Sequence, residues 1–236
     1  MKAVIQAGGK GTRLRPYTFV LPKPMMPVGE LPVIEILLKW MRRWGIKEAY
    51  ITTGYLGHLI RAHCNDGCQY DMKIRYSKEP EPLGTIGALR LLDEWLDETF
   101  FTINGDLITN INLREFVKFH KDHGGMISVG VTEKNIQVDL GVLDCNSHLM
   151  TDFREKPVMN FKVSMGIYCM EPEILELIPK GVPFGFDDLM HEMLAQNLPV
   201  NIFEHKGLWL DIGREEDFRY AQNGFMKEYK EMVLGC

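Results

Sequence analysis

The segment that decides the fold of this chain is its amino terminus, which reads MKAVIQAGGKGTRLRPYTFVLPKPMMP from Met1 to Pro27. A short apolar run at residues 3–5 predicts a buried β-strand. Glycines follow at positions 8, 9 and 11, where the missing Cβ lets the backbone turn sharply and approach a ligand closely. Because the N–H groups of such a loop can converge on an anion, the segment predicts a strand that ends in a phosphate-binding loop.

Positive charge gathers just behind this loop. Arg13, Arg15 and Lys23 occur in the segment, whereas Asp and Glu are absent from it. Guanidinium and ammonium groups form charge-assisted hydrogen bonds with phosphate oxygens, so together they can neutralise a polyphosphate. The alternative is a tight turn followed by solvated cations. The coincidence of clustered glycines, several cations and no acid favours a nucleoside triphosphate site.

Two familiar glycine loops do not match this segment. A P-loop requires Gly-Lys followed by Ser or Thr, but Lys10 is followed by Gly11. A dinucleotide-binding fingerprint requires a glycine at the position of Leu14 and a helix that begins at the loop. Prolines at positions 16, 22, 24 and 27 forbid a regular helix there. The segment therefore predicts a third kind of phosphate loop, which runs into an extended basic stretch.

The composition indicates one ordinary globular domain. The chain has 236 residues, of which 45% are hydrophobic, and a formal net charge of −5, which excludes the broad basic field of a nucleic-acid-binding protein. The five cysteines show no complete metal-ligand pattern, as is typical of a reducing compartment. No signal peptide is recognisable, and no apolar run reaches the ~18 residues of a membrane span. We therefore expect a cytoplasmic protein with a single domain at residues 1–236 and no membrane partner.

Strand and helix patterns alternate through the first half of the chain, which predicts a mostly parallel sheet between two layers of helices. Later predicted strands in this half are at residues 49–53, 72–76, 100–103 and 126–131. The predicted helices are at residues 31–45, 56–63, 87–95 and 113–120.

The pattern changes after about residue 135. Short strands at 141–143, 151–154 and 163–170 predict a small antiparallel extension. A helix at 186–195, capped near Asp187, precedes strands at 200–203 and 208–210 and a closing helix at 215–229. The fold predicted from these patterns is α/β, with a mixed, mostly parallel sheet in three layers.

Two aspartates follow predicted strands and could bind a cation. Asp106 ends the sequence Asn104-Gly105-Asp106 after a buried strand, where open α/β sheets bind ligands. Asp211 follows the short strand near Trp209. Magnesium uses few protein carboxylates beside phosphate oxygens, so two aspartates suffice. The alternatives are a β-turn for Asp106 and a helix N-cap for Asp211.

Two further stretches could contact a substrate. Residues 79–87 read EPEPLGTIG, in which Gly84 and Gly87 would allow a nucleobase to lie against the backbone. Residues 154–157 read REKP, where a carboxylate can accept bonds from sugar hydroxyls and a lysine can bind a phosphate. The alternatives are a loop with a helix cap for the first stretch and a solvated charge run for the second.

Taken together, these stretches resemble the sugar-1-phosphate nucleotidyltransferase family over nearly the whole chain. The motifs that carry the resemblance are AGGKGTRLRP, PKPMMPV, EPLGTIGAL, NGD, EKP and WLDIG, which occur in the order of the family. The resemblance implies a Rossmann-like α/β/α nucleotidyltransferase domain with a small antiparallel extension. With its compact single-domain form and the motifs GTRLRP and WLDIG, the chain is most similar to mannose- and heptose-1-phosphate guanylyltransferases.

The resemblance also implies a role for each matching residue. Arg13 would hold the β- and γ-phosphates, Lys23 the α-phosphate, and Asp106 and Asp211 a Mg²⁺ cofactor, so these four are the implied catalytic residues. The implied nucleotide-binding residues are Gln6, Ala7, Gly8, Gly9, Gly11, Thr12, Arg13, Lys23, Gly84, Thr85, Gly87, Asn104 and Gly105. The implied sugar-phosphate-binding residues are Gly141, Glu155, Lys156, Ser164 and Gly166.

Three positions depart from the usual family pattern. Gln6 stands in place of the common leucine, and Ile86 in place of a common alanine. The sequence Ser164-Met165-Gly166 replaces the usual Asn-Ala-Gly. The changes at Ile86 and at residues 164–166 concern the identity of the base and the sugar and leave the implied reaction class intact.

The implied reaction is one in-line displacement, in which a sugar 1-phosphate attacks the α-phosphorus of a nucleoside triphosphate and releases pyrophosphate. No general base is required, because a phosphate monoester with a second pKa of about 6 is mostly anionic at neutral pH. GTP is the favoured triphosphate, while uridylyl, thymidylyl and cytidylyl transfer share the same motifs. A silent nucleotide-sugar-binding regulatory subunit and a glycosyltransferase are the alternatives from other classes. The sequence does not determine which sugar 1-phosphate is used or whether the chain forms a homo-oligomer.

Overall fold

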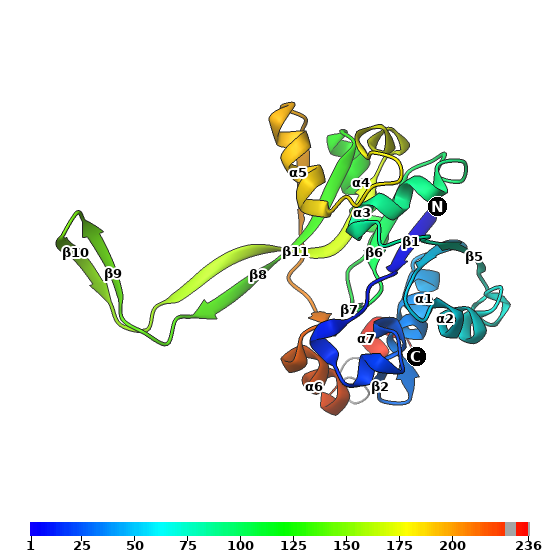
Figure 1. Ribbon diagram of the computed structural model, residues 1–236, viewed down its shortest axis with the longest axis horizontal. Helices are drawn as coiled ribbons and strands as arrows, with labels where there is room; N and C mark the ends of the chain where they lie inside the picture. The colour runs from blue at the N-terminus through cyan, green and yellow to red at the C-terminus, as the bar shows by residue number, and fades with distance from the viewer. Residues whose placement is uncertain (225–229, 236) are drawn as a thin grey trace.

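The computed structural model describes residues 1–224 and 230–235, and its centre is a seven-stranded mixed sheet (Figure 1). The strands lie in the order β12-β8-β11-β6-β1-β4-β5. Their bounds are Lys2–Ala7 for β1, Glu48–Thr53 for β4, Lys73–Lys78 for β5, Phe100–Asn104 for β6, Ile127–Gln137 for β8, Val158–Met170 for β11 and Val200–Glu204 for β12. Strands β6, β1, β4 and β5 are parallel neighbours, β12 is parallel to β8, and β11 is antiparallel to both β6 and β8. The predicted mixed, mostly parallel sheet is confirmed.

Helices cover both faces of the sheet, so the predicted three layers are also confirmed. One face packs against α1 (Val33–Arg43), α2 (Gly57–Cys64), α4 (Leu113–His123), α6 (Glu215–Gly224) and α7 (Lys230–Leu234). The other face packs against α3 (Gly84–Gly87), α5 (Phe186–Ala195) and 3-10 turns at Ala88–Leu92 and Pro172–Leu177. None of the helices in the described parts of the chain is long and apolar enough to cross a membrane.

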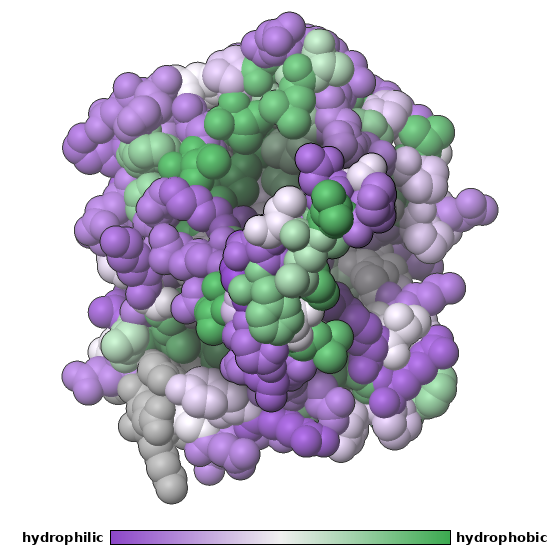
Figure 2. Space-filling model, turned by 90° about the vertical axis from the view of Figure 1, so that its left-hand side faces the viewer, coloured by the Kyte–Doolittle hydropathy of each residue, from purple (hydrophilic) through white to green (hydrophobic). Residues whose placement is uncertain are grey.

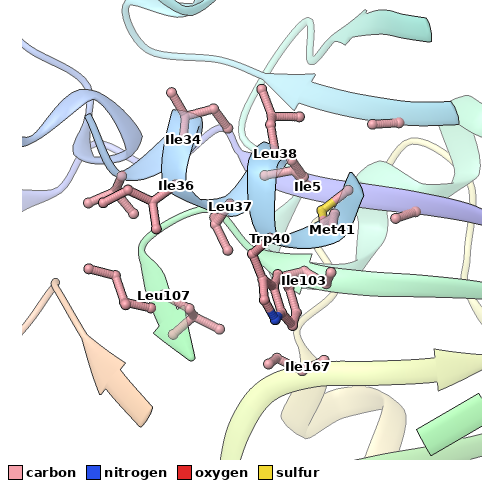
Figure 3. Packing of buried hydrophobic residues seen from close by; sticks show 14 of the residues in the cluster. Ile5, Ile34, Ile36, Leu37, Leu38, Trp40, Met41, Ile103, Leu107 and Ile167 are labelled. Carbon is pink, nitrogen blue, oxygen red and sulfur yellow. The ribbon is translucent and has the colours of Figure 1, made fainter. Parts of the chain in front are cut away.

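The core follows from the alternation of side chains along the buried strands. In β1, Ile5 points into the cluster beneath α1, whereas Val4 belongs to the cluster on the opposite face. Figure 3 shows Ile5, Ile103 from β6 and Ile167 from β11 around Trp40 of α1. Trp40 is 1% exposed, and its indole N–H donates to the Ile111 carbonyl at 3.3 Å. This packing holds β1 in the middle of the sheet, with its carboxyl end open.

The predicted helices at 87–95, 186–195 and 215–229 compare with the structure as follows. The expected helix at 87–95 is α3 followed by a 3-10 turn, because Ile86 and Gly87 donate their backbone N–H groups to the Phe184 carbonyl. Helix α5 is capped near Asp187, as predicted, because the N–H of its N-cap residue Gly185 donates to the Asp188 carboxylate at 2.7 Å. The expected closing helix is confirmed as α6 over 215–224, whereas the predicted residues 225–229 lie outside the described residues.

Strands β8 and β11 continue well beyond the sheet as a two-stranded ribbon. β12 follows β8 only as far as Val131, and β6 pairs with β11 only from Ile167 to Met170. Beyond these points β8 and β11 pair with each other out to Gln137 and Val158, and the hairpin of β9 (Val142–Asn146) and β10 (Leu149–Arg154) follows. Figure 1 shows this segment projecting from one side of the molecule. We call residues 132–163 the arm, and it is longer than the predicted antiparallel extension.

Candidate active site

A cleft of about 350 Å³ opens at the carboxyl ends of the parallel strands. The sequence-predicted residues that line it are Gln6, Ala7, Gly8, Gly9, Gly11, Arg13, Lys23, Gly84, Thr85, Asn104, Gly105 and Asp106. Its other lining residues include Pro24, Thr52, Glu79, Pro82 and Ala88. The amino-terminal loop and the turn after β6 therefore meet at one site, as open α/β sheets predict.

The glycine loop owes its shape to Gly11, whose φ angle of 62° lies in the left-handed region. A Cβ there would lie 2.7 Å from Lys23 Cγ and 2.9 Å from Thr18 Cγ2. The Thr18 hydroxyl also donates to the Gly11 carbonyl at 2.8 Å. Short 3-10 turns at Thr12–Leu14, Tyr17–Phe19 and Lys23–Met25 follow, as the prolines predict. The loop thus packs closely against the segment that carries Lys23.

Lys23, Asp106 and Asp211 converge at the end of the cleft. The Lys23 ammonium lies 2.6 Å from Asp106 Oδ2, and each of the two side chains is 15% exposed. A Cβ on Gly213 would overlap the ammonium and lie 2.9 Å from Asp211 Oδ1 and 3.1 Å from Asp106 Oδ2. Both carboxylates therefore lie beside the same point, although Asp211 is not itself part of the cleft lining.

Strand pairing brings the two aspartates together from distant parts of the sequence. Strand β7 (Leu107–Thr109) pairs antiparallel with β13 (Trp209–Asp211), and Leu107 lies opposite Asp211. The backbone N–H of Ile212 donates to the Asp106 carbonyl at 2.8 Å. The sequence placed each aspartate after a strand, and this short ladder explains why they become neighbours.

The two carboxylates suit a hard divalent cation. Burial raises the pKa of the Asp211 carboxyl, and the neighbouring Asp106 carboxylate raises it further. A cation between them would relieve both effects, and oxygen ligands are those that magnesium prefers. Among the described residues, no cluster of three or more Asp, Glu, His or Cys side chains could hold a metal ion. The remaining ligands of such a cation would therefore be phosphate oxygens and water.

Gln6 presents an unsatisfied amide at the cleft. Its side-chain oxygen and nitrogen are both buried and have no hydrogen-bond partner among the residues that the structure describes. Its backbone carbonyl accepts the Gly105 N–H at 2.9 Å, which ties the end of β1 to the turn after β6. A buried amide without partners is costly, so this position favours a ligand that supplies both a donor and an acceptor.

Glu79 lines the cleft and was missed as a site residue by the sequence reasoning. It follows β5 directly, and its Oε2 accepts the Leu83 N–H at 3.0 Å. Burial raises the pKa of this carboxyl, and its other oxygen lies against Gly8. The sequence signal was an acidic residue shortly after a parallel strand, which is also what selected Asp106.

In the 79–87 turn, Gly84 and Gly87 pack so closely against the backbone of residues 182–184 that a side chain would clash. Gly84 has a φ angle of 77°, and a Cβ there would lie 2.7 Å from the Phe184 carbonyl oxygen. A Cβ on Gly87 would lie 3.1 Å from the Val182 carbonyl oxygen. Gly84 and Thr85 line the cleft, whereas Gly87 and the loop residue Thr12 do not.

The residues predicted to bind the sugar phosphate are not gathered by this structure. Gly166 is buried beside Asn104, and a Cβ there would lie 2.9 Å from Asn104 Cγ. Ser164 lies nearby at the base of the arm, where its hydroxyl is 3.2 Å from the Tyr168 hydroxyl. Gly141, Glu155 and Lys156 are on the arm and do not line the cleft.

A sequence model of the family described as nucleotidyl transferase matches residues 2–228. The chain belongs to the nucleotidyl transferase family. It is 31% identical to UTP–glucose-1-phosphate uridylyltransferase of Synechocystis sp. over 99% of this chain and 66% of that protein. It is 33% identical to mannose-1-phosphate guanyltransferase of Aspergillus oryzae over 92% of this chain and 62% of that protein.

This nucleotidyl transferase chain thus spans less than two thirds of the length of these curated relatives. Among solved structures, HddC from Yersinia pseudotuberculosis superposes with a TM-score of 0.76 and 25% identity, covering 95% of this chain and 99% of that chain. A putative glucose-1-phosphate thymidylyltransferase from Bacillus anthracis superposes with a TM-score of 0.75 and 24% identity, covering 94% of each chain. The resemblance to sugar-1-phosphate nucleotidyltransferases is confirmed, as is the Rossmann-like fold.

Proposed function

We propose that this protein transfers a nucleotidyl group from a nucleoside triphosphate, with GTP favoured, to a hexose or heptose 1-phosphate. The observation that carries the proposal is the convergence of Lys23, Asp106 and Asp211 beside a cleft lined by the glycine loop and Arg13. Cations and carboxylates in this arrangement suit a metal-bound polyphosphate. The cleft is also open at the ends of β1 and β6, where nucleotides bind to such sheets.

The chemistry is one displacement at the α-phosphorus. A sugar phosphate oxygen forms a new bond to this phosphorus, the bond to the β-phosphate oxygen breaks, and pyrophosphate leaves with the electron pair. The nucleophile is already anionic at neutral pH, so no side chain has to remove a proton. The protein is left to position two anions that repel each other and to stabilise the leaving group.

Arg13 and Lys23 supply fixed positive charge for this task. Both line the cleft, and no acidic residue occurs between them in the sequence. Asp106 and Asp211 would hold Mg²⁺, which when bound adds positive charge beside the phosphates. Asp106 also fixes the Lys23 ammonium through their ion pair, so the cation is oriented before the substrate binds.

The preference for GTP is supported by Glu79. Guanine carries two adjacent donors, N1–H and N2–H₂, whereas uracil and thymine place a single donor between two acceptors. An ionised carboxylate only accepts hydrogen bonds, so the Glu79 carboxylate in the cleft is complementary to guanine. The Gln6 amide, which has no partner in the described part of the chain, offers both a donor and an acceptor, and so suits a carbonyl or hydroxyl of any nucleotide.

A substrate grid tests the proposal. Four nucleoside triphosphates are each combined with mannose, glucose and heptose 1-phosphates and Mg²⁺, and pyrophosphate release is measured. The expected result is release that requires both substrates and is fastest with GTP. The Asp106→Asn variant serves as the background control. Release fastest with UTP would replace the guanylyl assignment by a uridylyl one, and no release with any pair would overturn the proposed reaction.

A further inference from the structure

The surface at the β5 edge of the central sheet is polar. None of the eighteen large hydrophobic side chains that are exposed in the described residues lies between residues 21 and 90, which include β4, α2 and β5. Nine of them belong to the arm, where Figure 2 shows hydrophobic residues spread between polar ones. Figure 1 shows α2 and β5 on the side of the molecule away from the arm. The β5 edge therefore suits a polar ligand rather than an apolar protein surface.

A second cavity, of about 250 Å³, lies at this edge between α2 and the end of β5. Its wall carries three basic side chains, His58 and Arg61 from α2 and Lys78 from β5, and its described lining contains no acidic residue. Within the part of the chain that the structure describes, none of the three makes an ion pair. By contrast, Lys73 on the same strand lies 3.9 Å from the Glu48 carboxylate. Cations that surround a hollow without acidic partners attract an anion.

Arg61 is held at the wall of this cavity before any ligand binds. Its guanidinium carbon lies 5.0 Å from the centroid of the Tyr76 ring, which is a cation–π contact. The Tyr76 hydroxyl donates to the Asn65 carbonyl at 2.6 Å, and this bond fixes the ring. No acceptor among the described residues takes up the guanidinium N–H groups of Arg61, so they are left for an anion.

One backbone wall separates this cavity from the nucleotide cleft. Gly54 lines the cavity, and a Cβ there would lie 2.7 Å from the carbonyl oxygen of Gly8, which lines the cleft. On the neighbouring strand, Lys78 lines the cavity, whereas the next residue, Glu79, lines the cleft. The Thr53 carbonyl accepts the Glu79 N–H at 2.9 Å, which joins the ends of the two strands. A ligand in the cavity would therefore lie outside the cleft.

The residue types at the wall select the chemistry of the ligand. Arg and Lys form charge-assisted hydrogen bonds with phosphate oxygens, and a histidine adds a further N–H donor. A phosphate ion has the size of a few water molecules, each of about 30 Å³, so it would leave room in the cavity. We propose that this cavity is a second anion site, which binds a small phosphate ester such as a sugar phosphate. The proposal does not depend on the proposed reaction, because the cavity lies outside the cleft.

Calorimetric titration of the full chain tests the site with two probes, glucose 6-phosphate and inorganic phosphate. Both are expected to bind the wild type, the ester more tightly because it fills more of the cavity. Arg61→Ala and Lys78→Ala are each expected to weaken binding of the ester about tenfold or more, since each removes a charged donor. The matched control is Lys73→Ala, which removes the same charge from the other end of β5 and should leave binding unchanged.

Three results would overturn the proposal. They are binding of neither probe, equal binding by Lys78→Ala and Lys73→Ala, and tighter binding of the phosphate ion than of the ester. The first two would remove the site, and the third would remove the ester as its ligand.

Pyrophosphate release separates the cavity from the nucleotide cleft. The double variant Arg61→Ala/Lys78→Ala is expected to keep the wild-type rate, because neither side chain lines the cleft. The cleft variant Arg13→Ala is expected to keep its affinity for glucose 6-phosphate. Loss of release in the double variant, with an unchanged melting temperature, would assign the cavity to the nucleotide site and overturn a separate one. A wild type that binds the ester but releases no pyrophosphate with any substrate pair would support the anion site and overturn the proposed function.

Discussion

The Lys23 ammonium lies 2.6 Å from Asp106 Oδ2, and this ion pair joins the basic segment behind the glycine loop to the turn after β6. Each side chain is 15% exposed, so water screens the pair only in part. The lysine therefore has a fixed position beside the cleft, and the aspartate has a partner in the absence of a metal ion. Both residues carry the proposed chemistry.

Replacement of Lys23 by alanine is expected to lower kcat/KM by about 10²–10³-fold, which corresponds to ~3–4 kcal/mol in the barrier for one preorganised charged group. The loss should appear mainly in kcat, because the cation stabilises charge that develops as pyrophosphate leaves. The measurement is steady-state pyrophosphate release over a range of substrate concentrations, which gives kcat and KM separately. Lys10→Ala is the matched control, since Lys10 is an exposed lysine of the same loop that does not line the cleft. Turnover of Lys23→Ala equal to that of the control would contradict the role of Lys23.

The Asp211→Asn variant is expected to be inactive and yet more stable than the wild type at neutral pH. Burial and the Asp106 carboxylate raise the pKa of Asp211, so the folded protein binds this proton more readily than the unfolded chain does. The charged carboxylate thus costs stability at pH 7, and this cost disappears as the pH falls through the folded pKa towards the unfolded value of about 3.9. The stability advantage of Asp211→Asn should therefore shrink on acidification.

Thermal unfolding of both proteins between pH 4 and pH 8 measures this advantage. Added Mg²⁺ with GTP should raise the melting temperature of the wild type more than that of Asp211→Asn, because only the wild type keeps both carboxylates. Equal shifts in the two proteins would argue against a metal site at Asp106 and Asp211.

The sequence predicted the sheet well because its strands are buried and alternate with helices of clear periodicity. Asp106 was found as a candidate because it follows such a strand, and the same criterion would have selected Glu79. That Asp106 and Asp211 share one cation was a hypothesis from their places after two predicted strands, and the family resemblance implied it as well. The physical cause of their convergence, the pairing of Leu107 with Asp211, is a contact between residues far apart in the chain, which local patterns do not encode.

The predicted antiparallel extension is shorter than the arm for a related reason. Beyond the sheet, β8 reads TEKNIQ over residues 132–137 and β11 reads VMNFKV over residues 158–163. Neither pattern reveals whether a strand has a second neighbour. The 87–95 helix was misjudged because the Phe184 carbonyl accepts the N–H groups of Ile86 and Gly87, and that contact comes from a loop almost a hundred residues later. In each case the missing information is a tertiary contact rather than a local preference.

The Glu79→Gln variant is expected to lose its preference for GTP. One oxygen of the carboxylate would be replaced by an NH₂ group, which presents a donor to the donors of guanine. A hydrogen bond to a charged group contributes about 1.5–3 kcal/mol, so kcat/KM for GTP should fall roughly 10–100-fold. The value for UTP should change far less. The matched control is Glu81→Gln, because Glu81 is exposed in the same turn and does not line the cleft. A parallel fall for both triphosphates would assign Glu79 to the loop structure and not to the base.

Gly11 and Gly9 provide a matched pair that separates backbone strain from the mere addition of a methyl group. At Gly11, alanine would adopt a φ of 62° and meet Lys23 Cγ at 2.7 Å, whereas nothing lies within 4 Å of a Cβ at Gly9. The left-handed conformation alone costs roughly 1–2 kcal/mol for alanine. We therefore expect Gly11→Ala to lower the free energy of unfolding by at least this amount and Gly9→Ala to leave it nearly unchanged. Urea unfolding measures both values. Because the clash displaces Lys23, Gly11→Ala should also lower kcat, and a variant with wild-type stability and turnover would show that the loop does not hold Lys23 in place.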